Sequence, residues 1–387
     1  MKLLYISQHR FIRDKLGRIF STGAMDAEYF YKYLGVFDSV CVIGLLYDET
    51  EKNSMKHSSK TIEETEVITF SFVHSNSFQF YNPKVIKRLK SLINTKIETH
   101  DIIGCKTASG AGLANWIARK SNKPYFIEVV GCAWDSLWNY GLKGKIIALP
   151  YFLMQKKIVW NAPFVIYVTN SFLQSRYKTK GKTAAISDVT IEGKTSNPWM
   201  TRTKSFTEKI VIGTAGSVQS PYKGQRYVIE AISNLKNAGH GNYIYRLAGG
   251  GNCTALKQLA IKKGVANCII FDGVIPHNKM GTWYSSLDLY IQPSLTEGLP
   301  RALLEAMSYG LPSLGARVGG IPELLESSCL FRKRNPNEIE RLLIELTSKD
   351  LSKASQRNFL YSNQYSMSIL KKKRTEFLEL VKCSLEQ

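Results

Sequence analysis

Short apolar runs alternate with helical patterns along most of this 387-residue chain. In the first half, strand-like runs are interspersed with stretches whose apolar residues recur every three or four positions, the spacing of one helix face. This alternation predicts an α/β fold, a parallel sheet with helices on both faces. The predicted strands are 2–6, 40–45, 67–72, 102–105, 125–130, 165–168 and 183–186, with helices near 24–34, 83–95, 110–120, 145–158 and 170–176.

The alternation stops once and then restarts. Residues 190–208 are polar, contain Asn-Pro and show no apolar period, which is typical of an interdomain linker. We therefore expect two doubly wound, Rossmann-like domains that face each other across a cleft. The first domain is expected at 1–190 and the second at 209–365. A linker at 191–208 joins them, and a last helical segment follows at 366–387. The second-half strands are expected at 209–214, 244–248, 268–271, 289–292 and 313–316, with helices at 224–237, 253–263, 277–286, 300–309, 320–326, 336–347, 350–361 and 366–383.

Length and composition fit this division. Domains usually hold about 100–200 residues, so two are expected. No run of about 18 uncharged apolar residues occurs, and no transmembrane helix is predicted. The seven cysteines are scattered without a CxxC pair, which predicts reduced thiols in a cytoplasmic protein and argues against a structural metal site.

The chain is strongly basic, with a formal net charge of +21. No acidic residue lies between Asp135 and Asp188, and that interval carries Lys143, Lys145, Lys156, Lys157, Arg176, Lys178, Lys180 and Lys182. The segment 84–96 is also basic and free of acidic residues. Such segments indicate either contact with an anionic membrane surface or a solvated helix face. No nucleic-acid-binding pattern is present, so a nucleic-acid partner is not expected.

The segment 292–307, QPSLTEGLPRALLEAM, carries the strongest functional signal. A strand runs through a short loop with Glu297 and Gly298 into a helix, with Pro300 expected at the first helical position. Free amides at a helix start attract an anion such as a phosphate. Glu305 follows about one and a half turns later, where a carboxylate can accept hydrogen bonds from a diol such as a ribose. The segment predicts a site for a phosphorylated, hydroxyl-rich ligand.

Several glycine-containing turns also follow strands. GTAGSVQSPYKGQ (213–225) places Lys223 at a helix start, suited to a diphosphate or simply exposed on the surface. AGGGN (248–252, with Gly250), FDGVIPH (271–277, with Val274) and ARVGGIPELL (316–325) could bring backbone close to a ligand or form structural turns and caps. Residues 8–23 are expected to form a long basic loop, with Gly17, that faces phosphate or acceptor.

Taken together, these motifs resemble the Glu-x7-Glu signature of retaining family-4 glycosyltransferases of GT-B fold. The resemblance covers roughly 210–325 and includes Gln292-Pro293-Ser294, Glu297-Gly298-Leu299-Pro300, Glu305-Ala306-Met307, Gly319-Gly320, Gly249 to Gly251, Phe271 with Gly273, and Lys223-Gly224. It implies that the last helix crosses back onto the first domain.

The resemblance also assigns roles. It implies an NDP-sugar donor, with a UDP- or GDP-sugar expected, and places Glu305 on the ribose and Glu297 on the donor hexose. The amides of Gly298, Leu299 and Pro300 would lie near sugar and phosphate, and Lys223 would offset charge on the departing diphosphate. No metal is implied, and the chain has no DxD motif. Gly17, Ser217, Gly250, Val274 and Arg301 complete the expected donor-binding set.

Two positions depart from the family pattern. Ser217 stands where an arginine is common, so one positive charge at the diphosphate is either missing or supplied by another residue such as Arg301 or Arg226. Val130-Gly131 stands where many members carry histidine-glycine. Asp135, acidic in a basic stretch, is a candidate acceptor or catalytic residue, with helix capping as the structural alternative.

With this resemblance, we expect a metal-independent, retaining transferase. It would move a hexose or N-acetylhexosamine from an NDP-sugar to a glycan or lipid-linked glycan in surface polysaccharide assembly, as a peripheral protein on the inner face of the membrane. Two alternatives stay open: a nucleotide-sugar epimerase or hydrolase of the same fold, and a non-catalytic nucleotide-sugar-binding membrane adapter.

Overall fold

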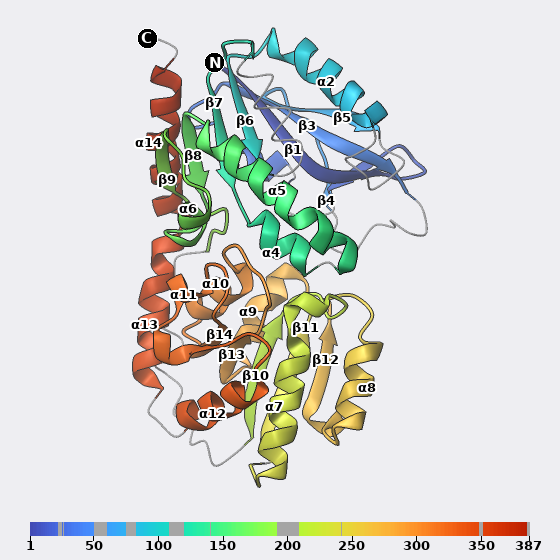
Figure 1. Ribbon diagram of the computed structural model, residues 1–387, viewed down its shortest axis with the longest axis vertical. Coiled ribbons are helices and arrows are strands. Elements are labelled where there is room, and N and C mark those ends of the chain that lie inside the picture. The colour runs from blue at the N-terminus through green and yellow to red at the C-terminus, as the bar shows by residue number, and fades with distance from the viewer. Residues whose placement is uncertain are drawn as a thin grey trace. The chain divides into compact units, whose positions relative to one another are not determined.

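The structure is a computed structural model that describes residues 1–21, 25, 27–49, 60–74, 83–107, 120–139, 141–191, 209–240, 242–347 and 351–384. Most of the expected helix at 110–120 and of the expected linker at 191–208 lies outside these residues. Internal contacts divide the chain into two compact units (Figure 1). Unit 1 comprises Met1–Ile186 with Lys371–Gln387, and unit 2 comprises Ser187–Leu370.

Unit 1 is built on a parallel sheet, as predicted. Seven strands pair in parallel in the order β5-β3-β1-β6-β7-β8-β9. Figure 1 shows α5 crossing this sheet, with α4 beside it. The strands are β1 (Lys2–Arg13), β3 (Ser39–Asp48), β5 (Ile68–His74), β6 (Ile102–Lys106), β7 (Tyr125–Val129), β8 (Phe164–Tyr167) and β9 (Lys182–Ala185); the helices are α1 (Ala27–Phe30), α2 (Pro83–Ile97), α4 (Ala133–Trp138), α5 (Leu142–Trp160) and α6 (Phe172–Arg176).

The prediction of a long loop at 8–23 is wrong. Strand β1 continues to Arg13 after a register shift between Ile6 and Arg10, and β2 (Ile19–Ser21) returns antiparallel to it and pairs with β4 (Lys60–Thr61). Phe11 and Ile12 are buried, and these two apolar side chains anchor a segment that otherwise looks polar. A tight turn closes the hairpin, in which an Asp14 carboxylate oxygen accepts hydrogen bonds from the amides of Leu16 and Arg18.

A buried carboxylate ties the last helix into unit 1. Glu128, at the end of β7, accepts hydrogen bonds from the hydroxyls of Tyr5 and Tyr33 at 2.8 and 2.7 Å. Burial alone raises the pKa of Glu128, but the cations of Lys32, Arg374 and Lys106 and the Tyr33 hydrogen bond outweigh it and lower this pKa to about 2. Arg374, from α14 (Met367–Cys383), is 3% exposed. A second contact of α14 is the packing of Phe377 against Phe164 of β8.

Unit 2 holds a second parallel sheet, also as predicted, in the order β12-β11-β10-β13-β14-β15. Its strands are β10 (Ile210–Ala215), β11 (Tyr243–Ala248), β12 (Ile269–Gly273), β13 (Leu289–Gln292), β14 (Ser313–Ala316) and β15 (Leu330–Phe331). The two-residue β15 was not expected, because so short a strand carries no period. The helices are α7 (Gln225–Asn237), α8 (Thr254–Lys262), α9 (His277–Ser285), α10 (Arg301–Ser308), α11 (Ile321–Leu324), α12 (Pro336–Thr347) and α13 (Ser352–Ser362).

Removing the Glu128 charge should destabilise the protein in a pH-dependent way. Glu128→Gln leaves three cations around a buried site without their counter-charge, and we expect a loss of about 3 kcal/mol near pH 7. Because the folded-state pKa lies below the unfolded value, the charge stabilises the fold above about pH 4.3, and this stabilisation is lost as the pH falls toward 2. Urea unfolding followed by tryptophan fluorescence measures the difference.

The control is Glu345→Gln, which breaks the exposed pair between Glu345 and Arg341. It should change the free energy of unfolding by less than about 1 kcal/mol. A difference between wild type and Glu128→Gln that does not shrink from about pH 6 to pH 3 would contradict the assigned pKa.

Candidate functional site

The candidate site lies where the strand order of unit 2 reverses. Strands β10 and β13 are neighbours, but the chain leaves β10 toward β11 on one side and leaves β13 toward β14 on the other. In open parallel sheets, ligands bind outside the carboxyl ends of strands at such a reversal. The loops that follow β10 and β13 are residues 216–224 and 293–300, the two segments with the strongest sequence signals.

An ion pair joins these two loops. The Lys223 ammonium lies 2.7 Å from Oε1 of Glu297, and the two side chains are only 21% and 13% exposed. Lys223 ends a short 3-10 helix, Pro221–Lys223, and its aliphatic chain passes close to Gly216, where a Cβ would lie 3.5 Å from Lys223 Cδ. A half-buried cation is therefore held against the carboxylate that the sequence singled out.

The carboxylate of Glu297 is oriented by a hydrogen-bonded relay. Its Oε1 also accepts bonds from Ser294 Oγ at 2.7 Å and Gln292 Nε2 at 3.1 Å. Gln292 accepts a bond from the Tyr290 hydroxyl at 2.8 Å, and burial raises the pKa of Tyr290 well above its ordinary value, so this donor keeps its proton. Within the described part of the chain, every hydrogen bond to the Glu297 carboxylate uses Oε1. Oε2 is thus left to accept from a ligand.

The loop after β14 supports the backbone of the same residues. The Gly320 amide donates to the Gly298 carbonyl at 2.7 Å, so it is not available to a ligand. Gly319 has φ +58°, and a Cβ there would lie 2.1 Å from the Glu297 carbonyl oxygen. The glycine pair in 316–325 therefore serves close backbone packing against the site loop.

Helix α10 begins one residue later than predicted. Pro300 is the N-cap, with ψ 112°, and Arg301 is the first helical residue. Proline has no N–H, so the predicted amide contact at Pro300 is wrong. The amides of Gly298 and Leu299 make no hydrogen bond to any other described residue. Two free donors thus stand beside a helix N-terminus, an arrangement that suits an anion.

Glu305 lies in α10 with one oxygen occupied. Tyr284 of α9 donates its hydroxyl to Glu305 Oε2 at 2.9 Å. Burial raises the pKa of Tyr284 far above its ordinary value, and the hydroxyl therefore stays a donor. Oε1 of Glu305 has no partner among the described residues and can accept from a diol.

The other glycine turns pack against one another. A Cβ on Gly249 would lie 2.0 Å from the Gly216 carbonyl oxygen, and one on Gly250 would lie 3.0 Å from Val274 Cγ2. Gly249 donates to the Gly273 carbonyl at 2.7 Å. The loops after β10, β11 and β12 thus approach backbone to backbone. Val274 is half exposed, and Ser217 is bonded through its carbonyl to Gln225 and through its hydroxyl to Ser220.

The remaining candidates separate into paired and exposed positions. Arg226 is ion-paired with Glu230, whereas Arg301 is exposed at the start of α10. Asp135 lies in the first turn of α4, where Cys132 is the N-cap; its Oδ2 is 3.7 Å from Arg176 Nη2. The expected cap at Asp135 is therefore wrong. Gly17 has φ +82° in the turn that closes the β1–β2 hairpin.

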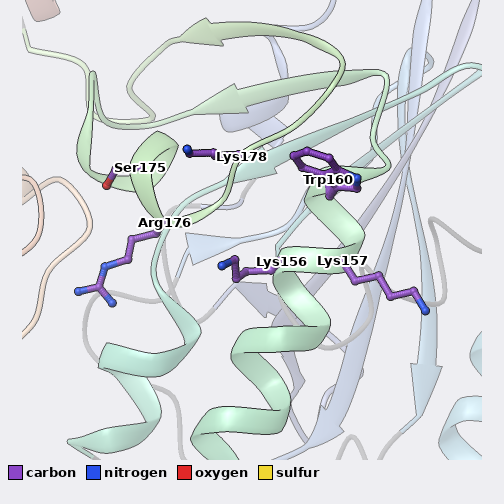
Figure 2. A pocket seen from close by; sticks show the side chains of 6 residues that line it. All are labelled: Lys156, Lys157, Trp160, Ser175, Arg176 and Lys178. Carbon is purple, nitrogen blue, oxygen red and sulfur yellow. The ribbon is translucent and has the colours of Figure 1, made fainter.

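Unit 1 contains a basic pocket of its own, with a volume of about 640 Å³ (Figure 2). It lies between the C-terminal end of α5 and the α6 segment. Its lining residues are Lys156, Lys157, Trp160, Ser175, Arg176 and Lys178. The sequence marked this interval as basic but did not indicate a cavity.

Sequence reasoning missed three supporting side chains. Tyr290 and Gln292 are two residues apart on β13, so their common direction follows from the strand period once a strand is assigned. Tyr284 reaches Glu305 from another helix, and no sequence signal pointed to it.

Comparisons with known proteins identify the family of this chain. Residues 209–349 match the family model described as glycosyl transferases group 1. The chain is 32% identical over 378 residues to protein CapJ of Staphylococcus aureus, covering 95% of this chain and 91% of CapJ. This protein belongs to the group 1 glycosyl transferases.

A further relative supports this assignment, and a solved structure shows the fold. The amylovoran biosynthesis glycosyltransferase AmsK of Erwinia amylovora is 37% identical over 111 residues, 27% of each chain. The crystal structure of HepE of Anabaena in complex with UDP aligns with a TM-score of 0.67 at 16% identity, over 98% of this chain and 100% of that chain. This protein has the same GT-B fold, with two α/β domains built on parallel sheets.

The contact between the two site loops can be tested at Gly224. It has φ +73°, and a Cβ there would lie 1.9 Å from the Pro293 carbonyl oxygen. Gly224→Ala should therefore lower the free energy of unfolding by about 2–4 kcal/mol, through backbone strain and a clash. Gly264→Ala is the matched control, because Gly264 has φ +68° with nothing within 4 Å. Equal losses in thermal unfolding would show that no clash with Pro293 exists.

Proposed function

We propose that this protein is a retaining, metal-independent glycosyltransferase that moves a hexose or N-acetylhexosamine from an NDP-sugar to a glycan or lipid-linked glycan. The observation that carries the proposal is the half-buried pair of Lys223 and Glu297 at the strand-order reversal of unit 2. The resemblance of the Glu297–Glu305 spacing to family-4 enzymes supports retention of configuration at the transferred sugar.

The donor assignments follow from unoccupied acceptors and donors. Oε1 of Glu305 accepts from a ribose hydroxyl while Tyr284 holds the other oxygen. The amides of Gly298 and Leu299 bind phosphate or sugar oxygens. The UDP complex of HepE supports UDP as the nucleotide. Gly17, Gly250, Val274 and Ser217 contribute backbone or surface contacts to the same donor.

Lys223 and Glu297 act at the bond that breaks. In the transfer, the bond between the anomeric carbon and the diphosphate oxygen breaks, an acceptor hydroxyl oxygen bonds to that carbon, and its proton is released. Negative charge grows on the diphosphate, where the Lys223 ammonium stabilises it. Glu297 Oε2 accepts from a sugar hydroxyl and orients the hexose. Arg301, exposed at the start of α10, supplies the second positive charge in place of an arginine at Ser217.

The acceptor side is proposed to involve unit 1. Asp135, held 3.7 Å from Arg176, is assigned to the acceptor or to its proton. AmsK is named for amylovoran biosynthesis, which supports a role in surface polysaccharide assembly. The basic segments of unit 1 support a peripheral position on an anionic inner membrane face. Membership of a glycosyl transferase family favours transfer over the epimerase, hydrolase and adapter alternatives.

A donor panel tests the proposal. The protein is incubated with UDP- and GDP-sugars, with and without membrane lipid extract, and nucleotide release and sugar transfer are followed. We expect nucleotide release to depend on the extract and the sugar to appear in a lipid or glycan. Sugar conversion without extract would support an epimerase or hydrolase, and binding without turnover for every donor would support the adapter.

Replacing Lys223 should affect turnover more than donor binding. Lys223→Ala removes a charge that is needed most as the diphosphate departs, so kcat should fall about 10²–10³-fold. Lys262→Ala, on the exposed side of α8, is the control and should leave kcat unchanged. Equal proportional losses in kcat and in donor affinity would show that Lys223 binds the donor in the ground state and does not specifically stabilise the transition state.

Replacing Glu305 should weaken nucleotide binding. Glu305→Ala removes a charged acceptor, and UDP binding should weaken by about 1–3 kcal/mol, or about 5- to 150-fold in Kd. Tyr284→Phe keeps the carboxylate but frees its Oε2, so a smaller loss is expected. Calorimetric titration with UDP measures both, and an unchanged Kd for Glu305→Ala would remove the ribose assignment.

A further inference from the structure

One face of α5 exposes large apolar side chains in a continuous row, here called the α5 stripe. It consists of Leu142, Ile146, Leu149 and Leu153, which recur at helical spacing. They are 77%, 71%, 51% and 53% exposed, respectively. An ordered row of exposed leucine and isoleucine indicates a surface that something covers.

The α5 stripe is separate from the face of α5 that packs against the core of unit 1. On its other side, α5 buries Gly144, Ala148, Gln155, Ile158 and Val159 against the unit. Helix α2, by contrast, buries Val85, Leu89 and Ile93, and its exposed residues are basic or polar except for Ile86. The α2 pattern is what packing on a sheet requires. Helix α5 has a second, exposed apolar face, which packing on the sheet does not require.

Cations flank and extend the stripe without an intervening acid. Lys143 and Lys145 lie near its start, and Lys156 and Lys157 continue the exposed side beyond Leu153. These last two are among the residues that line the basic pocket, with Arg176 and Lys178 (Figure 2). Long basic side chains can rest their methylenes on apolar surface while the charge reaches phosphate groups.

Tryptophans stand at both ends of the stripe. Trp138 precedes it and is 41% exposed, and Trp160 follows it and is 45% exposed. Lys145 and Lys180 place their ammonium groups 5.5 and 5.2 Å from the centres of these two rings. Tryptophan is enriched where protein meets the lipid headgroup region.

This combination selects a lipid bilayer over a protein partner. Lysine is depleted in protein–protein interfaces, whereas a helix that lies on a membrane combines an apolar face with lysine. The helix is about 28 Å long at 1.5 Å per residue. Among the described helices, none is long and apolar enough to cross a membrane, so α5 would lie in the plane.

We propose that α5 binds in the headgroup region of an anionic bilayer, with the α5 stripe inserted among the acyl chains and the basic pocket holding a lipid phosphate. This deepens the membrane position in the proposed function and rests on that part of it. Helix α2 contributes long-range attraction only, because its exposed side has little to insert. The binding therefore has two components, one screened by salt and one that persists.

Vesicle sedimentation tests the apolar component. Leu142→Glu with Ile146→Glu should reduce partitioning onto phosphatidylglycerol-containing vesicles about 10- to 100-fold. The matched control is Ile261→Glu with Leu360→Glu, two exposed aliphatic positions on unit 2 that make the same change in net charge. The control should lose much less binding. Equal losses in the two variants would mean that net charge alone binds the membrane and would overturn the insertion.

Salt and lysine variants test the charged component. At about 1 M salt, where screening acts within about 3 Å, wild type should keep measurable vesicle binding and the stripe variant should keep none. Lys156→Ser with Lys157→Ser should weaken low-salt binding by about fivefold per lysine. Binding of wild type that disappears at high salt would contradict insertion, and unchanged low-salt binding in the lysine variant would contradict the phosphate pocket.

Two readouts separate this inference from the transferase proposal. Thermal unfolding should be the same in wild type and in the stripe variant, which shows that the variant is folded, and calorimetric UDP binding should also be the same. Vesicle binding without any sugar transfer would refute the transferase and leave the membrane surface standing. The proposal would be overturned if wild type self-associates in solution, the stripe variant does not, and neither binds vesicles. That result would assign the α5 stripe to contact with a second copy of this chain.

Discussion

The reversal of strand order between β10 and β13 is the constraint on which the candidate site depends. It brings the loops after these two strands together at one edge of the sheet, although Lys223 and Glu297 are far apart in sequence. In open parallel sheets, a reversal of this kind is where ligands bind. In the proposed function, the half-buried ion pair between these loops would combine a cation for the departing diphosphate with a carboxylate for the sugar.

The precision of the site comes from glycine contacts and a hydroxyl relay. Gly224 and Gly319 let carbonyl groups of neighbouring loops approach within distances that any side chain would prevent. Tyr290 and Gln292 then direct Glu297 from the buried side of β13. Each of these contacts fixes an orientation before substrate arrives, which lowers the reorganisation that catalysis requires.

Unit 1 uses electrostatics in two different ways. Inside, the Glu128 carboxylate lies among the cations of Lys32, Lys106 and Arg374, and its attraction to Arg374 is one of the interactions that join α14 to unit 1. Outside, the cations of α5 and α6 have no acidic neighbours in sequence and gather around a pocket next to an exposed apolar row. The first arrangement stabilises the fold, and the second is available for an anionic surface.

Much of this protein follows from sequence alone, because helix and strand periods, glycine turns and the Glu297–Glu305 spacing are local patterns. The two parallel sheets, nearly all helices of unit 2, and the segments around Lys223 and Glu305 were predicted in this way. Only the tertiary structure decided that residues 8–13 extend β1, since their burial depends on neighbouring strands. It likewise decided that Tyr284 holds Glu305, that Asp135 faces Arg176, and that α5 leaves its stripe uncovered. These depend on contacts between segments distant in the chain, which no local period encodes.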